Sequence, residues 1–218
     1  MARLVLASAS PARLSVLRSA GVDPIVRVSA VDEDALIAEL GPGAAPDVVV
    51  TELARAKAAD VVPTLARDGL GDDTLVVGCD SMLLVDGQLQ GKPGTVEVAR
   101  ERWRAMAGRS ADLLTGHSVL CLGGGEVVAR AAGHSSTTVH FGRPTDADLE
   151  AYLASGEPLQ VAGAFTLDSL GGWFVERVEG DPSSVIGIGL PLVRRLLAEV
   201  GVSVARLWAS NTAEAPSI

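Results

Sequence analysis

One short segment near the start of the chain carries residue types that could bind a phosphate. The run Ser8-Ala9-Ser10-Pro11-Ala12-Arg13 follows the apolar residues 3–7. Serine at an N-cap and proline at the first helical position predict a helix that begins at Pro11. The free amides of a helix start, with two hydroxyls and a guanidinium beside them, favour an anion. The same residues also suit an ordinary capped helix with a surface arginine.

A single carboxylate interrupts the most apolar stretch of the sequence. Asp80 stands between the apolar runs 75–79 and 82–85. Burying a carboxylate is costly unless it is paired, bound to a metal or hydrogen-bonded. An apolar setting also raises the pKa of a carboxylate, which makes it a better base near neutral pH. Asp80 is therefore a candidate general base, and the structural alternative is an aspartate at the end of a strand.

Two lysines are candidates for contact with a phosphate. Lys57 lies among small residues in the run 54–58, on a helix that is expected to begin at Pro46. Lys92 lies between Gly91 and Pro93, in a segment one residue too short for a P-loop and without its Ser or Thr. The alternatives are an exposed helix lysine and a solvated loop lysine.

The elements that must position these residues alternate irregularly. Strands are expected at 3–7, 26–31, 74–79, 82–85, 113–122, 126–141, 161–167 and 173–179, and helices at 11–20, 95–107, 145–156 and 191–200. This is not the regular alternation of a doubly wound fold. It predicts an α/β protein with a mixed twisted sheet, flanking helices and two lobes around a cleft. Residues 1–208 are expected to form one domain, and residues 209–218 a frayed tail.

Composition excludes several classes of function. The 218 residues carry a net charge of −9 with 3% aromatics, which argues against a nucleic-acid partner. No apolar run approaches the roughly 18 residues of a membrane span, so no membrane partner is expected. Cys79 and Cys121 have no metal-ligand spacing and form no disulfide framework, which is typical of a cytoplasmic protein.

Taken together, these segments resemble the Maf family of nucleoside triphosphate pyrophosphatases, also called septum formation inhibitor Maf-like proteins. The resemblance covers about residues 3–201. The matching segments, in chain order, are 8–13 (SASPAR), 31–33 (VDE), 54–58 (ARAKA), 78–81 (GCDS), 91–93 (GKP), 115–116 (TG), 155–158 (SGEP), 162–165 (AGAF), 180–186 (GDPSSVI) and 189–191 (GLP).

The resemblance implies a fold, a reaction and a set of roles. The fold is a Maf/ITPase-like mixed sheet, and the reaction is hydrolysis of a nucleoside triphosphate between the α and β phosphates. Glu33 and Asp80 would hold Mg²⁺ or Mn²⁺, and Asp80 would also act on the water. The expected phosphate-binding residues are Ser8, Ser10, Arg13, Lys57 and Lys92. The physiological role would be removal of non-standard or excess nucleotides, and family analogy suggests a homodimer.

Three departures from the family pattern bear on the choice of base. Ala12 replaces an arginine, Ser81 replaces a threonine, and Asp168 stands where some members carry a glutamine. These positions are associated in the family with a preference for pyrimidines, so the sequence predicts a shifted preference here. A non-catalytic nucleotide-binding regulator of cell division is the alternative function; it would not need Asp80. An aspartyl phosphatase would need D-x-D, but residue 82 is Met.

Overall fold

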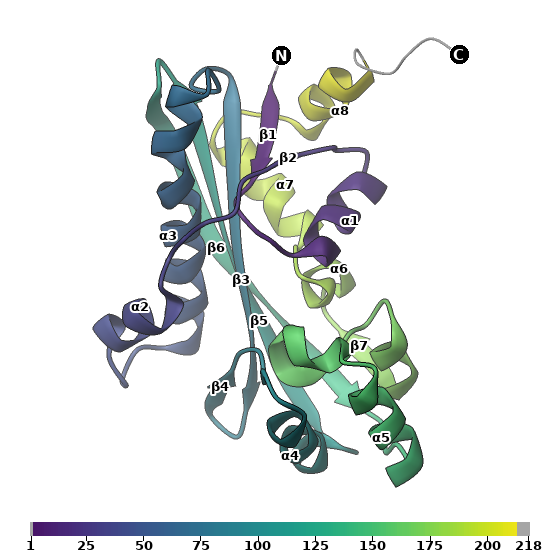
Figure 1. Cartoon of the computed structure of the whole chain (residues 1–218). Coiled ribbons are helices and arrows are strands. Elements are labelled where there is room, and N and C mark those ends of the chain that lie inside the picture. Colours follow the sequence, from purple (N-terminus) through teal and green to yellow (C-terminus); the bar gives the residue numbers. More distant parts are fainter. Residues whose placement is uncertain (1, 213–218) are drawn as a thin grey trace. The chain divides into compact units, whose positions relative to one another are not determined.

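The computed structural model describes residues 2–212 and contains a mixed sheet flanked by helices, as predicted (Figure 1). In the described part of the chain the sheet has seven strands in the order β2-β1-β3-β5-β6-β7, with β4 paired to β3. The strands are β1 (Arg3–Leu6), β2 (Ile25–Val26), β3 (Thr74–Val85), β4 (Gln88–Gln90), β5 (Ser110–Gly123), β6 (Glu126–Phe141) and β7 (Val175–Glu179). β1 runs parallel to β2 and β3, whereas β4 and β7 are antiparallel to their partners.

The chain divides into two compact units. Among the described residues, one unit comprises residues 2–80, 116–134 and 190–212, and the other comprises residues 81–115 and 135–189. Strands β3, β5 and β6 contribute residues to both. We refer to them as the N-terminal unit and the central unit and describe each by itself.

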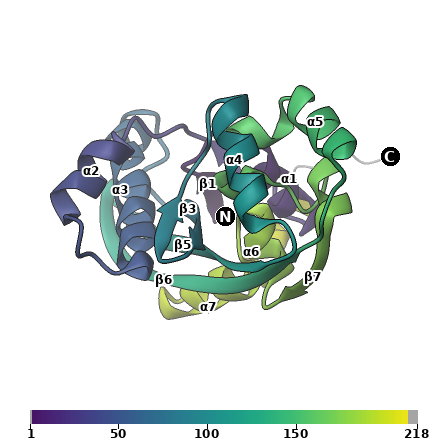
Figure 2. The same ribbon diagram turned by 90° about the horizontal axis from the view of Figure 1, so that it is seen from below.

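The N-terminal unit carries the long helix of the protein on its part of the sheet. Its helices are α1 (Pro11–Ser19), α2 (Glu33–Leu40), α3 (Pro46–Arg67), α7 (Leu190–Glu199) and α8 (Val204–Thr212). Strand β6 passes between α3 and α7 (Figure 2). Apolar residues of α3 pack on those of the strands in one buried cluster, formed by Val5, Ala7, Ala58, Val61, Leu65, Leu70, Val76, Leu120 and Leu122.

The central unit is organised around one tryptophan. Its helices are α4 (Val96–Met106), α5 (Asp146–Ala154) and α6 (Pro182–Ile186), with 3₁₀ turns η1 (Glu157–Gln160), η2 (Ala162–Ala164) and η3 (Leu170–Phe174). The buried ring of Trp103 meets Phe141, Tyr152 and Phe174 edge-on, and its Nε1 donates to the Ala164 carbonyl at 2.8 Å. These contacts combine apolar burial with favourable aromatic geometry and leave the indole donor satisfied.

The structure differs from the sequence-based expectation in several segments. The strand expected at 26–31 ends at Val26, and residues 27–32 have no regular structure. The prediction of a strand at 161–167 is wrong. Gly163 and Ala164 adopt positive φ angles of 70° and 61°, and the chain forms the 3₁₀ turn η2 there. Helix α8 runs on through 209–212, beyond the expected domain boundary at 208; residues 213–218 lie outside the described residues.

Within residues 2–212, none of the helices combines the length and the apolar character that crossing a bilayer requires.

Candidate active site

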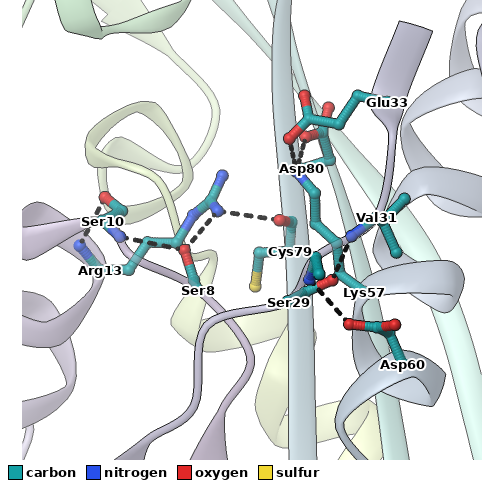
Figure 3. Close-up of polar contacts among 11 residues, drawn as sticks. Ser8, Ser10, Arg13, Ser29, Val31, Glu33, Lys57, Asp60, Cys79 and Asp80 are labelled. Carbon is teal, nitrogen blue, oxygen red and sulfur yellow. Dashed lines mark hydrogen bonds and ion pairs between the residues drawn. The ribbon is translucent and has the colours of Figure 1, made fainter.

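The start of α1 carries the serines and the arginine that were predicted to bind an anion. Ser10 is the N-cap, and its Oγ accepts a hydrogen bond from the Arg13 amide at 3.4 Å. Ser8 Oγ accepts from the Ser10 amide at 3.2 Å and from the Arg13 guanidinium at 2.9 Å. The two hydroxyls, the guanidinium and the helix start are therefore held together by hydrogen bonds among themselves (Figure 3).

Arg13 is a buried residue rather than a surface arginine. Arg13 is only 9% exposed. The guanidinium nitrogen that donates to Ser8 Oγ also donates to the Cys79 carbonyl at 2.8 Å. Cys79 directly precedes Asp80 on β3. The guanidinium thus links the start of α1 to the strand that carries the candidate base, which a simple capped helix would not do.

Two glycines allow helix α3 to lie unusually close to the sheet. A Cβ at position 78 would lie 2.2 Å from the Ala54 carbonyl oxygen, and one at position 116 would lie 2.0 Å from that of Val50. Any side chain at these two positions would push the helix away, because real Cβ atoms do not approach so closely. Gly78 and Gly116 therefore set the distance at which a side chain of α3 can reach β3.

Lys57 uses this close approach to bind two carboxylates. Its Nζ lies 2.5 Å from Asp80 Oδ1 and 2.7 Å from Glu33 Oε1 (Figure 3). The Lys57 and Asp80 side chains are 11% and 8% exposed, whereas Glu33, the first residue of α2, is 53% exposed. Asp80 lies inside the continuous strand β3, so it is not an aspartate at a strand end.

Burial and charge act in opposite directions on Asp80. Desolvation raises the pKa of the Asp80 carboxyl above its usual range, and the neighbouring Glu33 carboxylate adds to this. The Lys57 ammonium and the Arg13 guanidinium oppose the rise by favouring the ionised form of Asp80, which is the opposing effect of burial and nearby charge. The result is a carboxylate that is a stronger base than an exposed aspartate and still faces cations.

Cys79 does not act as a nucleophile in this arrangement. Its side chain is fully buried, and burial raises the pKa of the thiol to about 11. A thiol with such a pKa is protonated at neutral pH, and the thiolate is the reactive form. Cys79 therefore contributes a small buried side chain and a main-chain carbonyl for Arg13.

The two carboxylates of Glu33 and Asp80 are suited to a hard divalent cation whose other ligands come from a bound phosphate. Glu33 and Asp80 each direct a carboxylate oxygen at the same ammonium, so a cation already occupies the position between them. Mg²⁺ is commonly held by one or two carboxylates together with substrate phosphates. No group of three or more His, Cys, Asp or Glu residues suited to a metal occurs in residues 2–212.

Of the remaining predicted residues, Ala12 is the second residue of α1 in the N-terminal unit, and the other three belong to the central unit. Lys92 is exposed in the irregular segment that follows β4. Ser81 Oγ lies 3.1 Å from Thr115 Oγ1, whose hydroxyl is also 3.0 Å from the Ser184 carbonyl. Asp168 is exposed in the loop between η2 and η3. Among the predicted residues, the N-terminal unit thus brings together Ser8, Ser10, Arg13, Glu33, Lys57 and Asp80.

Two functional candidates were not singled out from the sequence. Asp60 Oδ2 accepts a hydrogen bond from the Ala30 amide at 2.8 Å, in the segment that leads to Glu33. Its spacing of three residues from Lys57 on a helix was the available signal. Glu157 accepts hydrogen bonds from Thr166 and Ser169 in the loop that carries Asp168. Glu157 could have been identified from the sequence by its position in the segment 155–158, which matches the family pattern.

The sequence of this chain matches those of a known protein family. The family model described as "Maf-like protein" matches residues 3–200. A protein of Rhodococcus jostii named "Nucleoside triphosphate pyrophosphatase" is 78% identical, over 97% of this chain and 98% of its own length. Proteins with the same name from Nocardia farcinica and Mycobacterium marinum are 70% and 61% identical, each over at least 94% of both chains. The chain belongs to the family of Maf-like proteins.

Proposed function

We propose that the protein is a nucleoside triphosphate pyrophosphatase, which hydrolyses the bond between the α and β phosphates and releases a nucleoside monophosphate and pyrophosphate. The observation that carries the proposal is Asp80, a buried carboxylate inside β3 that is held by Lys57 and faces Arg13. The shared name of relatives that are 61–78% identical over nearly the whole chain supports the same activity.

Asp80 serves as the general base. The oxygen of a water molecule bonds to the α phosphorus while Asp80 takes its proton. The bond between that phosphorus and the oxygen that bridges to the β phosphate breaks, and that oxygen leaves with pyrophosphate. A base works best when its pKa lies near the working pH, so the raised pKa of Asp80 suits this role.

Cations and helix amides bind the triphosphate chain. The substrate brings about four negative charges, which must be balanced for a water to attack. Arg13, Lys57 and Lys92 bind phosphate oxygens, and Ser8 and Ser10 orient them together with the amides at the start of α1. Because charge moves toward the leaving pyrophosphate, cations at the β and γ phosphates stabilise the transition state more than the bound substrate.

The two carboxylates provide the site for a divalent cation. Glu33 and Asp80 would hold Mg²⁺ or Mn²⁺, which when bound supplies positive charge to the phosphate oxygens. Lys57 occupies the position between these carboxylates in the structure. Its long flexible side chain can release them and turn to a phosphate.

The proposed setting follows from composition and family analogy. We expect a cytoplasmic homodimer that removes non-standard or excess nucleotides. The net charge of −9 disfavours a nucleic-acid partner. Light scattering of the purified protein tests the dimer, and a monomer at micromolar concentration would contradict it.

A panel of triphosphates tests the activity directly. The purified protein is incubated with canonical and modified triphosphates and Mg²⁺, and pyrophosphate and orthophosphate are assayed separately. The proposal predicts pyrophosphate and nucleoside monophosphate in equal amounts. Orthophosphate as the product would indicate a phosphatase, and binding without either product would indicate a non-catalytic nucleotide-binding protein. The Asp80→Asn protein, purified in parallel, controls for contaminating hydrolases.

A further inference from the structure

A segment without regular structure carries Glu33 across the face of helix α3. Residues 27–33, which we call the strap, connect the end of β2 at Val26 to the start of α2 at Glu33. Val28 in the strap is 63% exposed, and an open depression of about 580 Å³ lies between the strap and α3. Apolar packing of Val28 therefore does not hold this part of the strap, and polar contacts connect the strap to α3 and its C-cap.

Three side chains make polar contacts with the strap: two belong to α3, and the third belongs to Asp68, the C-cap residue of α3. Asp68 Oδ2 lies 3.3 Å from an Arg27 guanidinium nitrogen, Asp60 Oδ2 accepts the Ala30 amide at 2.8 Å, and Lys57 contacts Glu33. Residues 57, 60 and 68 share one face of the helix, because their spacings of three and eleven are near whole numbers of turns. Figure 3 shows Asp60 below Lys57 on this face, with its carboxylate directed at the strap.

The backbone of the strap is fixed at two points: the Arg27 amide donates to the Leu6 carbonyl of β1 at 3.0 Å, and the Ala30 amide donates to Asp60, three residues closer to Glu33. Val31 donates its amide to Ser29 Oγ, which lies in the strap itself. Among the described residues, the bond from the Ala30 amide to Asp60 is the only hydrogen bond from the backbone of residues 28–31 to another element. The contacts of the Arg27 and Glu33 side chains with Asp68 and Lys57 act through long side chains, which leave the backbone of residues 28–33 freer to move.

We propose that Asp60 is a positioning residue that sets the place of the Glu33 carboxylate, and through it the cation that Glu33 and Asp80 would hold. Ala30 is three residues before Glu33, so a shift of the strap moves the carboxylate with it. The Lys57 contact cannot do this when a cation is bound, because the cation competes for the same two carboxylates. Asp60 then keeps the strap in place. This inference rests on the proposed function.

Cation affinity measured without turnover tests the inference. Mn²⁺ binding is followed by electron paramagnetic resonance in the presence of an α,β-methylene triphosphate, which cannot be cleaved at the scissile bond. Asp60→Ala should weaken Mn²⁺ binding about tenfold, the lower end expected for a hydrogen bond to a charged acceptor. Asp60→Asn, whose amide oxygen can accept the same hydrogen bond, should restore most of the affinity.

Two further variants separate positioning from charge and from stability. Glu52→Ala removes a carboxylate from the same helix that pairs with Arg55 and does not contact the strap, so it should bind Mn²⁺ like the wild type. Ala30→Pro removes the donor and leaves Asp60 in place, and adding Asp60→Ala to it should cause no further loss. Thermal unfolding of each variant shows whether the fold is intact.

The outcomes distinguish the inference from the function on which it rests. If the wild type releases no pyrophosphate from any triphosphate, both fail. If the wild type is active and Asp60→Ala binds Mn²⁺ as tightly as Glu52→Ala does, the inference fails while the proposed function stands. A rise in the Mn²⁺ concentration needed for half-maximal activity, with kcat at saturating Mn²⁺ nearly unchanged, supports positioning, because a general loss of stability would not produce this pattern.

Discussion

Lys57 Nζ lies 2.5 Å from Asp80 Oδ1, across 23 positions of the sequence and with both side chains almost fully buried. The contact depends on the absence of a side chain at position 78, where α3 touches β3. The ammonium opposes the rise that burial imposes on the pKa of Asp80. The strength of the proposed base is thus set by a residue on another element.

Removing the Lys57 charge should move the acid limb of the pH–activity profile. In Lys57→Met the pKa of Asp80 loses its largest lowering influence and rises further, so the base becomes protonated at a higher pH. The acid limb of kcat/KM should therefore shift to higher pH, whatever happens to the plateau. Lys57→Arg keeps the charge and should shift the limb less. A limb at the wild-type pH in Lys57→Met would show that Lys57 does not set the pKa of the base.

Asp80→Asn should retain the fold and nucleotide binding while losing turnover. The amide has nearly the same shape as the carboxylate but cannot take a proton from water. Loss of a general base typically lowers kcat by about 10²–10⁴-fold. Binding of the α,β-methylene triphosphate by calorimetry and a melting curve serve as controls. A folded variant with near-normal kcat would remove Asp80 from this role.

Arg13 should matter far more than its neighbour on the same helix. Arg13 is buried against Ser8 and the Cys79 carbonyl, whereas Arg18 is exposed and pairs with Asp23. Loss of one charge-assisted phosphate contact should lower kcat/KM about 10–100-fold in Arg13→Ala, with part of the loss in kcat. Arg18→Ala is the matched control and should stay near the wild type. Equal effects of the two substitutions would mean that only the overall charge of α1 matters.

The parts of the site that depend on local signals could be predicted from the sequence. Ser10 and Pro11 specify a helix start through capping, which involves neighbouring residues only. Asp80 could be recognised as a candidate site residue, because a carboxylate in an apolar run needs a compensating partner. The identity of that partner could not be predicted, because it depends on how closely α3 approaches β3. Lys57 was a candidate without a known contact.

The errors in the prediction of the fold also arise from contacts between residues that are distant in the sequence. The apolar segment 161–167 has the composition of a strand, but Ala164 adopts a φ of 61° and its carbonyl accepts a hydrogen bond from Trp103. Tertiary contacts thus override local propensity there. Residues 26–31 were predicted as a strand, but β1 ends at Leu6, whose carbonyl accepts the Arg27 amide, and no strand in the described part of the chain pairs with residues 28–31. Helix α2 was missed although Asp32 is a good N-cap.

Glu157 should stabilise the protein in a pH-dependent way. Its carboxylate accepts hydrogen bonds from the Thr166 and Ser169 hydroxyls and from the Leu170 and Gly171 amides. Burial opposes ionisation, but these donors together hold the pKa of Glu157 below its usual value of 4.5. A lowered pKa contributes stability that is present above the ordinary value and is lost as the pH falls through the folded-state value.

Replacement of Glu157 by alanine tests this account. Removing the acceptor leaves several donors without a partner and should reduce the free energy of unfolding by about 1–3 kcal/mol at neutral pH. For a chain of this size each kcal/mol corresponds to about 2–4 °C in Tm. The difference between wild type and variant should stay constant above the ordinary glutamate pKa and shrink below it. A difference that is unchanged at pH 3 would show that the ionised form is not what stabilises the loop.

The choice of nucleobase should differ from that of family members with the arginine, threonine and glutamine set. Ala12, the second residue of α1, offers no donor where an arginine could reach a base carbonyl and a phosphate. Ser81 keeps a hydroxyl, which already contacts Thr115 Oγ1. Asp168, when ionised, offers only acceptors, whereas glutamine both donates and accepts. We therefore expect that dTTP and UTP are no longer clearly the best substrates.

The physical reason lies in the pattern of donors on each base. An acceptor-only carboxylate suits a base edge that carries an amino group and opposes the paired carbonyls of uracil or thymine. A polar group that loses its partner with the wrong ligand weakens the binding of that ligand, which produces discrimination between substrates. The measurement is kcat/KM across canonical and modified triphosphates for the wild type and for Ala12→Arg combined with Asp168→Gln. The double variant should gain activity toward dTTP and UTP relative to the others. A wild type that strongly prefers dTTP and UTP, with the same profile in the double variant, would show that these positions do not set the choice.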